Sequence, residues 1–254
     1  MRATPAGFIS LAGTEPSTSG QTSQVFVVSR GGELFVCKRL GPRALGEPRM
    51  RERLAAEGRL LEQLAGRGAP RLVASGEDAR GPWIVMERVA SAPLSSHRGR
   101  HHARWLEDAA RAAFDALAWV HGAGIVHGDL SPDNVLVADD AGRAVLVDFG
   151  LALAPSMPPL PAGPFRGTLV YAAPEVARCE PFDARADLFA LAASLLHVWS
   201  GEAPRAKASD AAMLLGAGEQ GIEGWAARAA RGLSPELARR LVAGCSFDAR
   251  GRLA

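Results

Sequence analysis

A change in the hydrophobic pattern near residue 90 is the feature that most constrains the fold of this chain. Before that point, four short runs rich in β-branched and aromatic residues are typical of strands, at residues 24–29, 34–40, 71–77 and 82–89. Between the second and third runs, leucines recur at helical spacing over residues 49–66. Beyond residue 90 the pattern is mostly helical. We therefore predict an α+β chain, with a small antiparallel sheet and one helix followed by a larger, mainly helical part.

The connector between the two parts, at residues 90–96, consists of small residues and a proline, which is typical of a hinge. We expect one part over residues 1–89 together with the hinge and the other over residues 90–254, both within one domain. In the second part, helical patterns occupy residues 103–124, 186–201, 208–218 and 234–245, and strand patterns occupy residues 135–139 and 144–150.

Charge and cysteine content exclude several classes of protein. The 29 basic and 27 acidic side chains leave a net charge of +2, which argues against nucleic acid as a main partner because binding a phosphate backbone requires clustered cations. The three cysteines lie far apart, so neither a zinc site nor a disulfide framework is expected. The longest apolar run, residues 188–199, is too short to span a bilayer. We therefore expect a cytoplasmic protein without a membrane segment.

One buried carboxylate is predicted in the helix at residues 49–66. Leu54 and Leu61 mark its apolar stripe, and Glu57 lies three residues after the first and four before the second, on the same stripe. The other two glutamates of this helix lie five residues to either side and turn away, at about 100° per residue. An unpaired buried carboxylate costs several kcal/mol, so we expect an ion pair with Lys38, which lies at the end of a predicted strand.

A polar loop, IVHGDLSPDN at residues 125–134, joins two apolar stretches. It holds a histidine, two aspartates and an asparagine, and taken alone it is either a polar turn between two pieces of core or a catalytic loop. A further acidic group, Asp148, follows a predicted strand in the sequence VDFG. Each feature is common by itself, so the interpretation depends on their order along the chain.

Taken in order, these features resemble a eukaryotic-type (Hanks-type) serine/threonine protein kinase domain of the kind also found in bacteria. FVCK at residues 35–38 resembles the family's V-A-I-K, and HGDLSPDN at residues 127–134 resembles H-R-D-L-x-x-x-N. DFG at residues 148–150 and APE at residues 173–175 match outright. The resemblance covers nearly the whole chain. It implies the two-lobe kinase fold, with the two parts described above as the N-lobe and the C-lobe.

Further segments fit the family and imply structural contacts. ADLFALA resembles the helix whose aspartate, here Asp187, supports the catalytic loop from below. FDARGR, near the end of the sequence, supplies Arg250, which is expected to pair with Glu175. His127 and Phe149 are expected to stack with the helix of the N-lobe and to couple it to the active site.

The resemblance assigns roles in phosphoryl transfer, a reaction that depends mostly on positioning and charge neutralisation. Lys38 is expected to hold the α- and β-phosphates of ATP and to be fixed by Glu57. Asp148 and Asn134 are expected to hold Mg²⁺, with Mn²⁺ as a possible substitute, because hard oxygen ligands suit these ions. Asp129 is expected to accept or orient the proton of the substrate hydroxyl.

The resemblance also implies a nucleotide pocket. Met86 corresponds to the residue at the back of the adenine site, and the backbone from Glu87 to Val89 is expected to hydrogen-bond the adenine. The loop that covers the phosphates in this family keeps only the middle one of its three glycines. The residues expected to bind the nucleotide, among which Val25, Cys37 and Leu136 enclose the ring, are Gly20, Val25, Cys37, Lys38, Met86, Glu87, Val89 and Leu136.

Two departures from the family concern regulation. Gly128 replaces the arginine that typically meets a phosphorylated activation loop. The loop at residues 151–165 has one hydroxyl group, on Ser156, no charges and five prolines. We therefore predict activity that does not need phosphorylation of this loop.

A third departure concerns the acceptor. Ser131 replaces a lysine that neutralises the transferred phosphate in many serine/threonine kinases. Three functions stay open: a kinase of serine or threonine in proteins, a small-molecule phosphotransferase of the aminoglycoside or choline type, and an ATP-binding pseudokinase scaffold. The segment GTLVYAAPE, which builds a platform for a peptide in protein kinases, favours the first.

Overall fold

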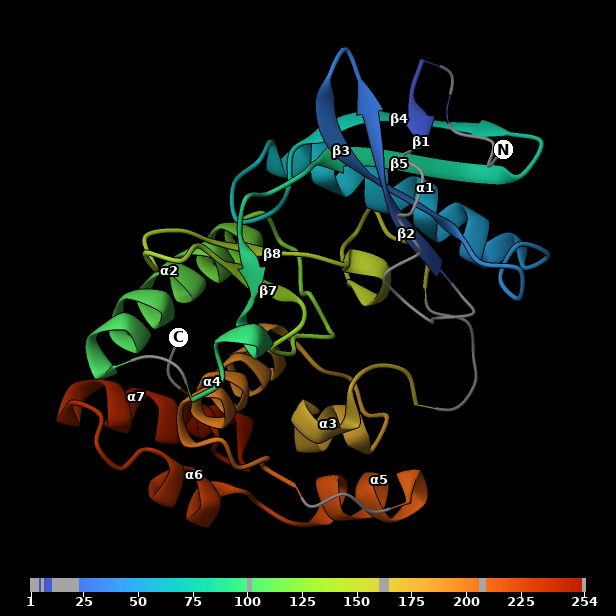
Figure 1. Ribbon diagram of the computed structural model, residues 1–254. Helices are drawn as coiled ribbons and strands as arrows, with labels where there is room; N and C mark the ends of the chain where they lie inside the picture. Colours follow the sequence, from blue (N-terminus) through green and yellow to red (C-terminus); the bar gives the residue numbers. More distant parts are fainter. Residues whose placement is uncertain are drawn as a thin grey trace. The chain divides into compact units, whose positions relative to one another are not determined.

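The computed structural model describes residues 5, 7–10, 23–99, 102–159, 165–205 and 209–252. The chain divides into two compact units, shown in Figure 1. The sheet unit comprises residues 1–90 and 154–162, and the helical unit comprises residues 91–153 and 163–254. No helix among the described residues has the length and apolar character needed to cross a membrane.

The sheet unit is built on an antiparallel sheet with the strand order β1-β2-β3-β5-β4. Its strands are β1 (Ile9–Ser10), β2 (Ser23–Arg30), β3 (Glu33–Leu40), β4 (Leu72–Asp78) and β5 (Gly81–Glu87). Gly31 and Gly32 join β2 to β3 and both have positive φ, 61° and 83°. Two successive positive φ values are what a tight hairpin turn requires, and glycine adopts them without strain.

The two faces of this sheet carry different partners. Residues directly opposite each other in an antiparallel ladder share a face. One face holds the apolar cluster formed by Phe8, Phe26, Val28, Phe35, Cys37 and Val85. The other face packs against helix α1 (Pro48–Leu64), where a Cβ at Gly58 would lie 3.0 Å from Cγ2 of Ile84. Ile84 pairs with Lys38 in the ladder, so the side chain of Lys38 lies on the face that α1 covers.

The helical unit combines a small sheet with most of the helices. Its strands are β6 (Ala92–Pro93), β7 (Val135–Val137) and β8 (Ala144–Leu146), and its α-helices are α2 (Ala103–Gly122), α3 (Pro174–Ala177), α4 (Ala184–Ser200), α5 (Asp210–Glu219), α6 (Glu223–Ala229) and α7 (Pro235–Gly244). Helix α4 packs against α2, α6 and α7 (Figure 1). Burial on nearly all sides explains why its sequence is apolar all round.

The predicted fold class is confirmed: an antiparallel sheet with one helix comes first, and a mainly helical part follows. The connector at residues 90–96 is more ordered than expected. It contains strand β6 and begins the 3₁₀ helix η1 (Leu94–His97). Proline is tolerated in β6 because this strand is at the edge of its sheet, where a missing N–H does not break a ladder. Helix α6 was not predicted, because its seven residues are too few to show a clear period.

Candidate active site

The sheet unit contains the predicted ion pair between Lys38 and Glu57. The Nζ atom of Lys38 lies 2.7 Å from Oε1 and 2.8 Å from Oε2 of Glu57. Both residues are buried, at 5% and 2% exposure. Removal of either partner alone would leave a charge in a place from which water is excluded.

The face of Lys38 also carries the candidate adenine-binding residues of this unit. Val25 is opposite Lys38 in the ladder of β2 and β3, and Met86 is opposite Val36 in the ladder of β3 and β5. Because side chains alternate along a strand, Val36 shares the face of Lys38. These residues therefore form one apolar surface beside the lysine.

Cys37 lies on the other face, contrary to the role expected of it. It is fully buried in the apolar cluster with Phe26 and Val85, and this burial raises the pKa of its thiol to about 11. The correction has a simple cause: a strand has a period of two, so the residue next to Lys38 points away from the lysine's face. Val36, two positions before the lysine, lies on the sheet face that was predicted for Cys37.

The remaining nucleotide-binding predictions of this unit fall at the end of β5 or outside the described residues. Glu87 ends β5, and its N–H donates to the carbonyl of Arg71 at 3.0 Å. Val89 lies two residues beyond the end of β5, directly before the connector. Gly20 lies outside the described residues.

In the helical unit, Asp187 organises the loop at residues 125–134. Its Oδ2 accepts the N–H of His127 at 2.7 Å, and its Oδ1 accepts the N–H of Gly128 at 2.9 Å. Nε2 of His121, at the end of α2, lies 2.9 Å from the same Oδ2. Asp187 is 1% exposed, so these contacts replace its hydration. The predicted support by Asp187 is present, whereas the sequence reading missed His121.

His127 bridges the backbone on both sides of the loop. Its Nδ1 lies 3.3 Å from the N–H of Asp129, and its Nε2 lies 2.9 Å from the carbonyl of Val147. A backbone N–H can only donate and a carbonyl oxygen can only accept, so Nδ1 accepts and Nε2 donates. The ring packs on Phe149 with centroids 4.7 Å apart. His127 is therefore a structural brace within the helical unit, and its expected stacking with the helix of the N-lobe stays a prediction.

The carboxyl group of Asp129 is held by the segment that precedes APE. The N–H of Thr168 donates to Oδ1 of Asp129 at 2.8 Å. Gly167 permits this approach, because it has a φ of 113° and a Cβ there would lie 3.2 Å from Oδ1. Burial raises the pKa of Asp129 above its usual value, against the lowering effect of the hydrogen bonds from Thr168. A raised pKa makes this carboxylate a stronger proton acceptor.

Asn134 and Asp148 present oxygen atoms from the strand ends of the small sheet. Nδ2 of Asn134 donates to the carbonyl of Asp129 at 2.8 Å, which turns the oxygen of the amide away from that carbonyl. The carbonyl of Asn134 accepts the N–H of Val147, the residue before Asp148, at 3.0 Å. Asp148 has a left-handed backbone, with φ 65° and ψ 70°. Such a conformation costs about 1–3 kcal/mol and is characteristic of functional sites.

These two side chains fit a magnesium ion that also binds a nucleotide. Among the described residues, no three side chains of His, Cys, Asp or Glu are grouped as a metal site of their own. Mg²⁺ in nucleotide sites is typically held by one or two protein oxygens, with phosphate oxygens and waters completing the octahedron. Leu136 is half-buried in the middle of β7, while its neighbours Val135 and Val137 are fully buried on the opposite face. It is thus available to line a ligand.

Residues 18–228 match the family model of the protein kinase domain. The chain belongs to the protein kinase domain family. This confirms the resemblance on which the site residues were chosen.

The curated relatives include bacterial serine/threonine kinases. The chain is 30% identical over 195 residues to serine/threonine-protein kinase PknL of Mycobacterium tuberculosis, which covers 73% of this chain and 48% of the relative. It is 38% identical over 173 residues to the DNA damage-responsive serine/threonine-protein kinase RqkA of Deinococcus radiodurans, covering 65% of this chain and 26% of the relative. It is 42% identical over 107 residues to serine/threonine-protein kinase PknJ of M. tuberculosis, covering 41% and 18%. The chain therefore spans about half the length of PknL and less of the others.

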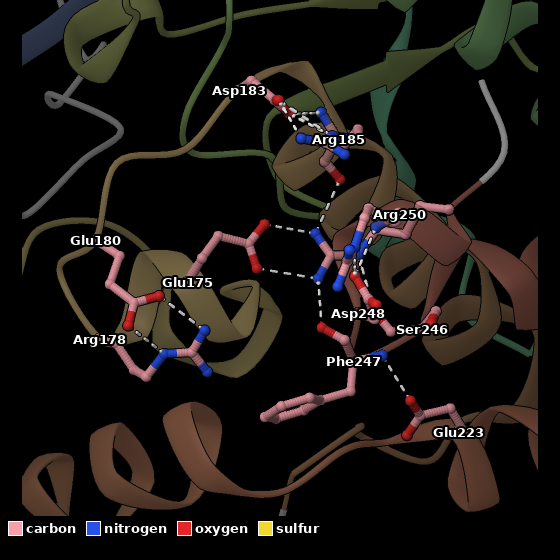
Figure 2. A network of polar contacts seen from close by, with 11 residues as sticks. Glu175, Arg178, Glu180, Asp183, Arg185, Glu223, Ser246, Phe247, Asp248 and Arg250 are labelled. Atoms are coloured by element: carbon pink, nitrogen blue, oxygen red, sulfur yellow. Dashed lines mark hydrogen bonds and ion pairs between the residues drawn. The ribbon is translucent and has the colours of Figure 1, made fainter.

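The glutamate of the kinase APE segment has a different partner from the one predicted. Arg252 binds Glu175 through both guanidinium ends, with Nη1 2.5 Å from Oε1 and Nη2 3.0 Å from Oε2. Figure 2 shows hydrogen bonds to both carboxylate oxygens of Glu175, and it shows the labelled Arg250 in contact with Asp248. The side chain of Arg252 is 0% exposed and that of Arg250 is 85% exposed. The prediction of Arg250 was wrong because the 3₁₀ helix η4 (Ala249–Gly251) turns that side chain outward.

Two further sets of contacts that the sequence reading missed hold the segment that precedes APE. The hydroxyl of Tyr171 lies 2.7 Å from Nδ1 of His197, whose pKa burial lowers to about 4, so the histidine is neutral and accepts. Nη1 of Arg205 donates to the carbonyls of Leu169 at 3.3 Å and Val170 at 2.8 Å. Burial lowers the pKa of Arg205 to about 10, which leaves it charged at neutral pH. Both contacts fix the 3₁₀ helix η3 (Leu169–Tyr171) to the helical unit.

Proposed function

We propose that this chain is a magnesium-dependent protein kinase domain that transfers the γ-phosphate of ATP to serine or threonine hydroxyls of a protein. The observation that carries the proposal is the hydrogen-bonded loop of the helical unit. It combines Asp129, whose pKa is raised by burial, with Asn134, whose amide is oriented by Asp129, and both rest on Asp187 through the loop backbone. A polar turn that only joins two pieces of core does not need such an arrangement.

The sheet unit supplies the nucleotide contacts in this proposal, and corresponds to the N-lobe with the hinge. Lys38, fixed by Glu57, holds the α- and β-phosphates. Val25, Val36 and Met86 line the adenine from the face they share with Lys38. The backbone around Glu87 to Val89 hydrogen-bonds the adenine edge, and Gly20 belongs to the loop over the phosphates.

The helical unit corresponds to the C-lobe and supplies the chemistry. Leu136 lines the adenine from this unit, and Asn134 and Asp148 hold Mg²⁺, which neutralises phosphate charge when bound. Asp129 takes the proton of the acceptor hydroxyl while the hydroxyl oxygen forms its bond to the γ-phosphorus. The bond from that phosphorus to the oxygen bridging to the β-phosphate breaks, and ADP leaves. Ser131 is 3% exposed and brings no charge, so Lys38 is the side-chain cation that this proposal assigns to the phosphates.

The acceptor is a protein in this proposal because residues 165–173 are organised as a platform. Thr168 binds Asp129, and Tyr171 and Arg205 tie η3 to the helical unit. The relatives named above are serine/threonine-protein kinases. We also propose that activity does not require phosphate on the activation segment, because Gly128 offers no cation to receive it.

A single assay separates the proposed function from its competitors. The purified chain is incubated with labelled ATP and Mg²⁺ in the presence of itself, a generic basic protein, or a panel of aminoglycosides and amino alcohols. We expect transfer to protein serine or threonine that disappears in Asp129→Asn. Transfer only to the small hydroxyl compounds would identify a small-molecule phosphotransferase, and nucleotide binding without transfer would identify a pseudokinase.

A further inference from the structure

Arg53 is a fully buried arginine on the same helix as Glu57. It lies one turn before Glu57, and its exposure is 2%. Nη1 of Arg53 donates to the backbone carbonyl of Pro158, which is 105 residues away along the chain. An arginine is rarely buried without a specific partner, because desolvation of its charge must be compensated. This contact is therefore a candidate for a function of its own.

The partner segment, residues 154–159, is grouped with the sheet unit although the chain on both sides of it belongs to the helical unit. On the N-terminal side, Leu153 pairs with Val126 through two backbone hydrogen bonds of 2.8 and 2.9 Å. Within the segment, the N–H of Met157 donates to the carbonyl of Ala154 at 3.0 Å, and the Met157 side chain is 9% exposed. The segment is thus held by Arg53 and by burial of Met157.

The chemistry of this anchor does not involve phosphate. The acceptor is a backbone carbonyl, and residues 154–159 contain no charged side chain. Their one hydroxyl, on Ser156, belongs to an exposed residue. Prolines at 155, 158 and 159 restrict the unfolded backbone, which lowers the entropy that the chain loses when the segment is ordered.

Arg53 and Glu57 are coupled because they share one face of a rigid helix. Residues four apart lie one above the other, with about 6 Å between their Cβ atoms. A shift or rotation of α1 that pulls Arg53 away from Pro158 also moves Glu57 away from Lys38. The reverse holds as well, so the order of the activation segment and the Lys38–Glu57 pair support each other.

We propose that Arg53 is a positioning residue that anchors residues 154–159 to α1 without phosphorylation and thereby holds Glu57 at Lys38. The consequence for catalysis rests on the proposed function. The contact between Arg53 and residues 154–159 does not depend on the proposed function, so a structural measurement can test it whether or not the chain is an active kinase.

The test uses variants of two arginines of α1 in the full chain. Arg53→Met removes the donor at similar length, Arg53→Lys keeps a cation with a donor, and Arg59→Met is the matched control because Arg59 is exposed. Amide hydrogen exchange of residues 154–159 is measured first. We expect faster exchange at Met157 in Arg53→Met, and unchanged exchange in Arg59→Met. Equal exchange in all variants overturns the anchor.

Kinetics of dephosphorylated protein then test its effect on catalysis. We expect kcat to fall about 10- to 100-fold in Arg53→Met, because a misplaced catalytic group costs that much. Arg53→Lys should recover part of the rate, as should millimolar guanidinium added to Arg53→Ala, which leaves open the space that the arginine filled. Loss of activity without rescue by either route, together with lower thermal stability, identifies a purely structural role and overturns the proposal. An inactive wild-type chain with an intact anchor counts against the proposed function only.

Discussion

The carboxylate of Asp187 lies 2.7 Å from the backbone nitrogen of His127, and with it the loop that holds Asp129 is fixed to helix α4. Asp187→Asn keeps the size of the side chain but presents an N–H₂ group to a backbone N–H. A buried donor without an acceptor costs about 1–3 kcal/mol. We expect a loss of that order in the free energy of unfolding, measured by urea denaturation, and a fall in kcat of more than about tenfold.

Glu180→Gln serves as the control for Asp187→Asn, because Glu180 forms an ion pair with Arg178 at the surface. Exposed pairs of this kind contribute little to stability. The control should unfold like the wild type. If both variants unfold alike, Asp187 does not hold the loop in the way its contacts indicate.

Variants of the Lys38–Glu57 pair are expected to affect stability and phosphoryl transfer differently. Lys38→Met leaves the Glu57 carboxylate buried without its cation, and breaking a buried pair typically costs about 3–5 kcal/mol. Adding Glu57→Leu to Lys38→Met removes the second charge, so we expect much of the lost stability to return. Phosphoryl transfer should stay abolished in both, since each lacks Lys38. Unfolding curves and the transfer assay on the same preparations check this, and a double variant as unstable as the single one contradicts it.

The two arginines near the C-terminus provide a matched comparison. Arg252→Ala leaves the Glu175 carboxylate, which is 13% exposed, without its bidentate partner, and should cost about 3 kcal/mol of unfolding free energy. Arg250→Ala removes a contact of an 85% exposed side chain and should leave stability unchanged. The midpoints of urea denaturation measure both. Equal losses would mean that Glu175 is shared between the two arginines.

Because Asp129 is buried, its replacement should change the stability of the domain by an amount that depends on pH. Burial raises the pKa of Asp129 in the folded state, so the folded chain binds a proton more readily than the unfolded chain. The folded chain therefore keeps its full stability at pH below the pKa of Asp129 in the unfolded chain, which is about 3.9. It loses stability relative to the unfolded chain as pH rises through the pKa of Asp129 in the folded state. Asp129→Asn should stabilise the chain more at pH 7 than at pH 4, as measured by the thermal midpoint. Its transfer rate should fall about 10²- to 10⁴-fold, which is the usual contribution of a general base.

Removal of phosphate should not impair the domain. Ser156 is exposed, Gly128 offers no cation to a phosphate, and Arg53 already binds the segment through a carbonyl. We expect Ser156→Ala and phosphatase-treated protein to keep kcat within about twofold of the untreated chain. Mass spectrometry confirms the absence of phosphate before the assay. A requirement for phosphate on Ser156 or Thr168 contradicts the prediction.

Helix α1 shows how far the sequence could predict the site. Glu57 was predicted to be buried because it is on the leucine stripe, and because a carboxylate there needs a partner. Arg53 is next to Leu54 and equally buried, yet its partner could not be predicted, since Pro158 is remote and offers only a backbone carbonyl. The helical spacing of apolar residues predicts which side chains of a helix face inward, but it does not predict which distant segment they contact.

The two wrong predictions, Cys37 and Arg250, have a common physical cause. Motif matching located each segment correctly but not the direction of its side chains. In β3 a shift of one residue exchanges the two faces of the sheet, and in η4 a shift of two residues exchanges an exposed arginine for a buried one. By contrast, Asp129, Asn134 and Asp187 stand at the positions that the resemblance assigned to them, and they meet in one hydrogen-bonded assembly.

The bidentate pair of Glu175 and Arg252 also sets where the domain can be cut for expression. A fragment trimmed to the family match, residues 18–228, would lose Arg252 and all of α7. It would also lose Phe8, whose ring packs edge-on to Phe35 at 5.8 Å and fills the apolar cluster of the sheet. Such a fragment would expose the apolar cluster of the sheet unit. It would also leave the carboxylate of Glu175 in the helical unit without its arginine partner. Boundaries for crystallisation or screening should therefore include both Phe8 and Arg252.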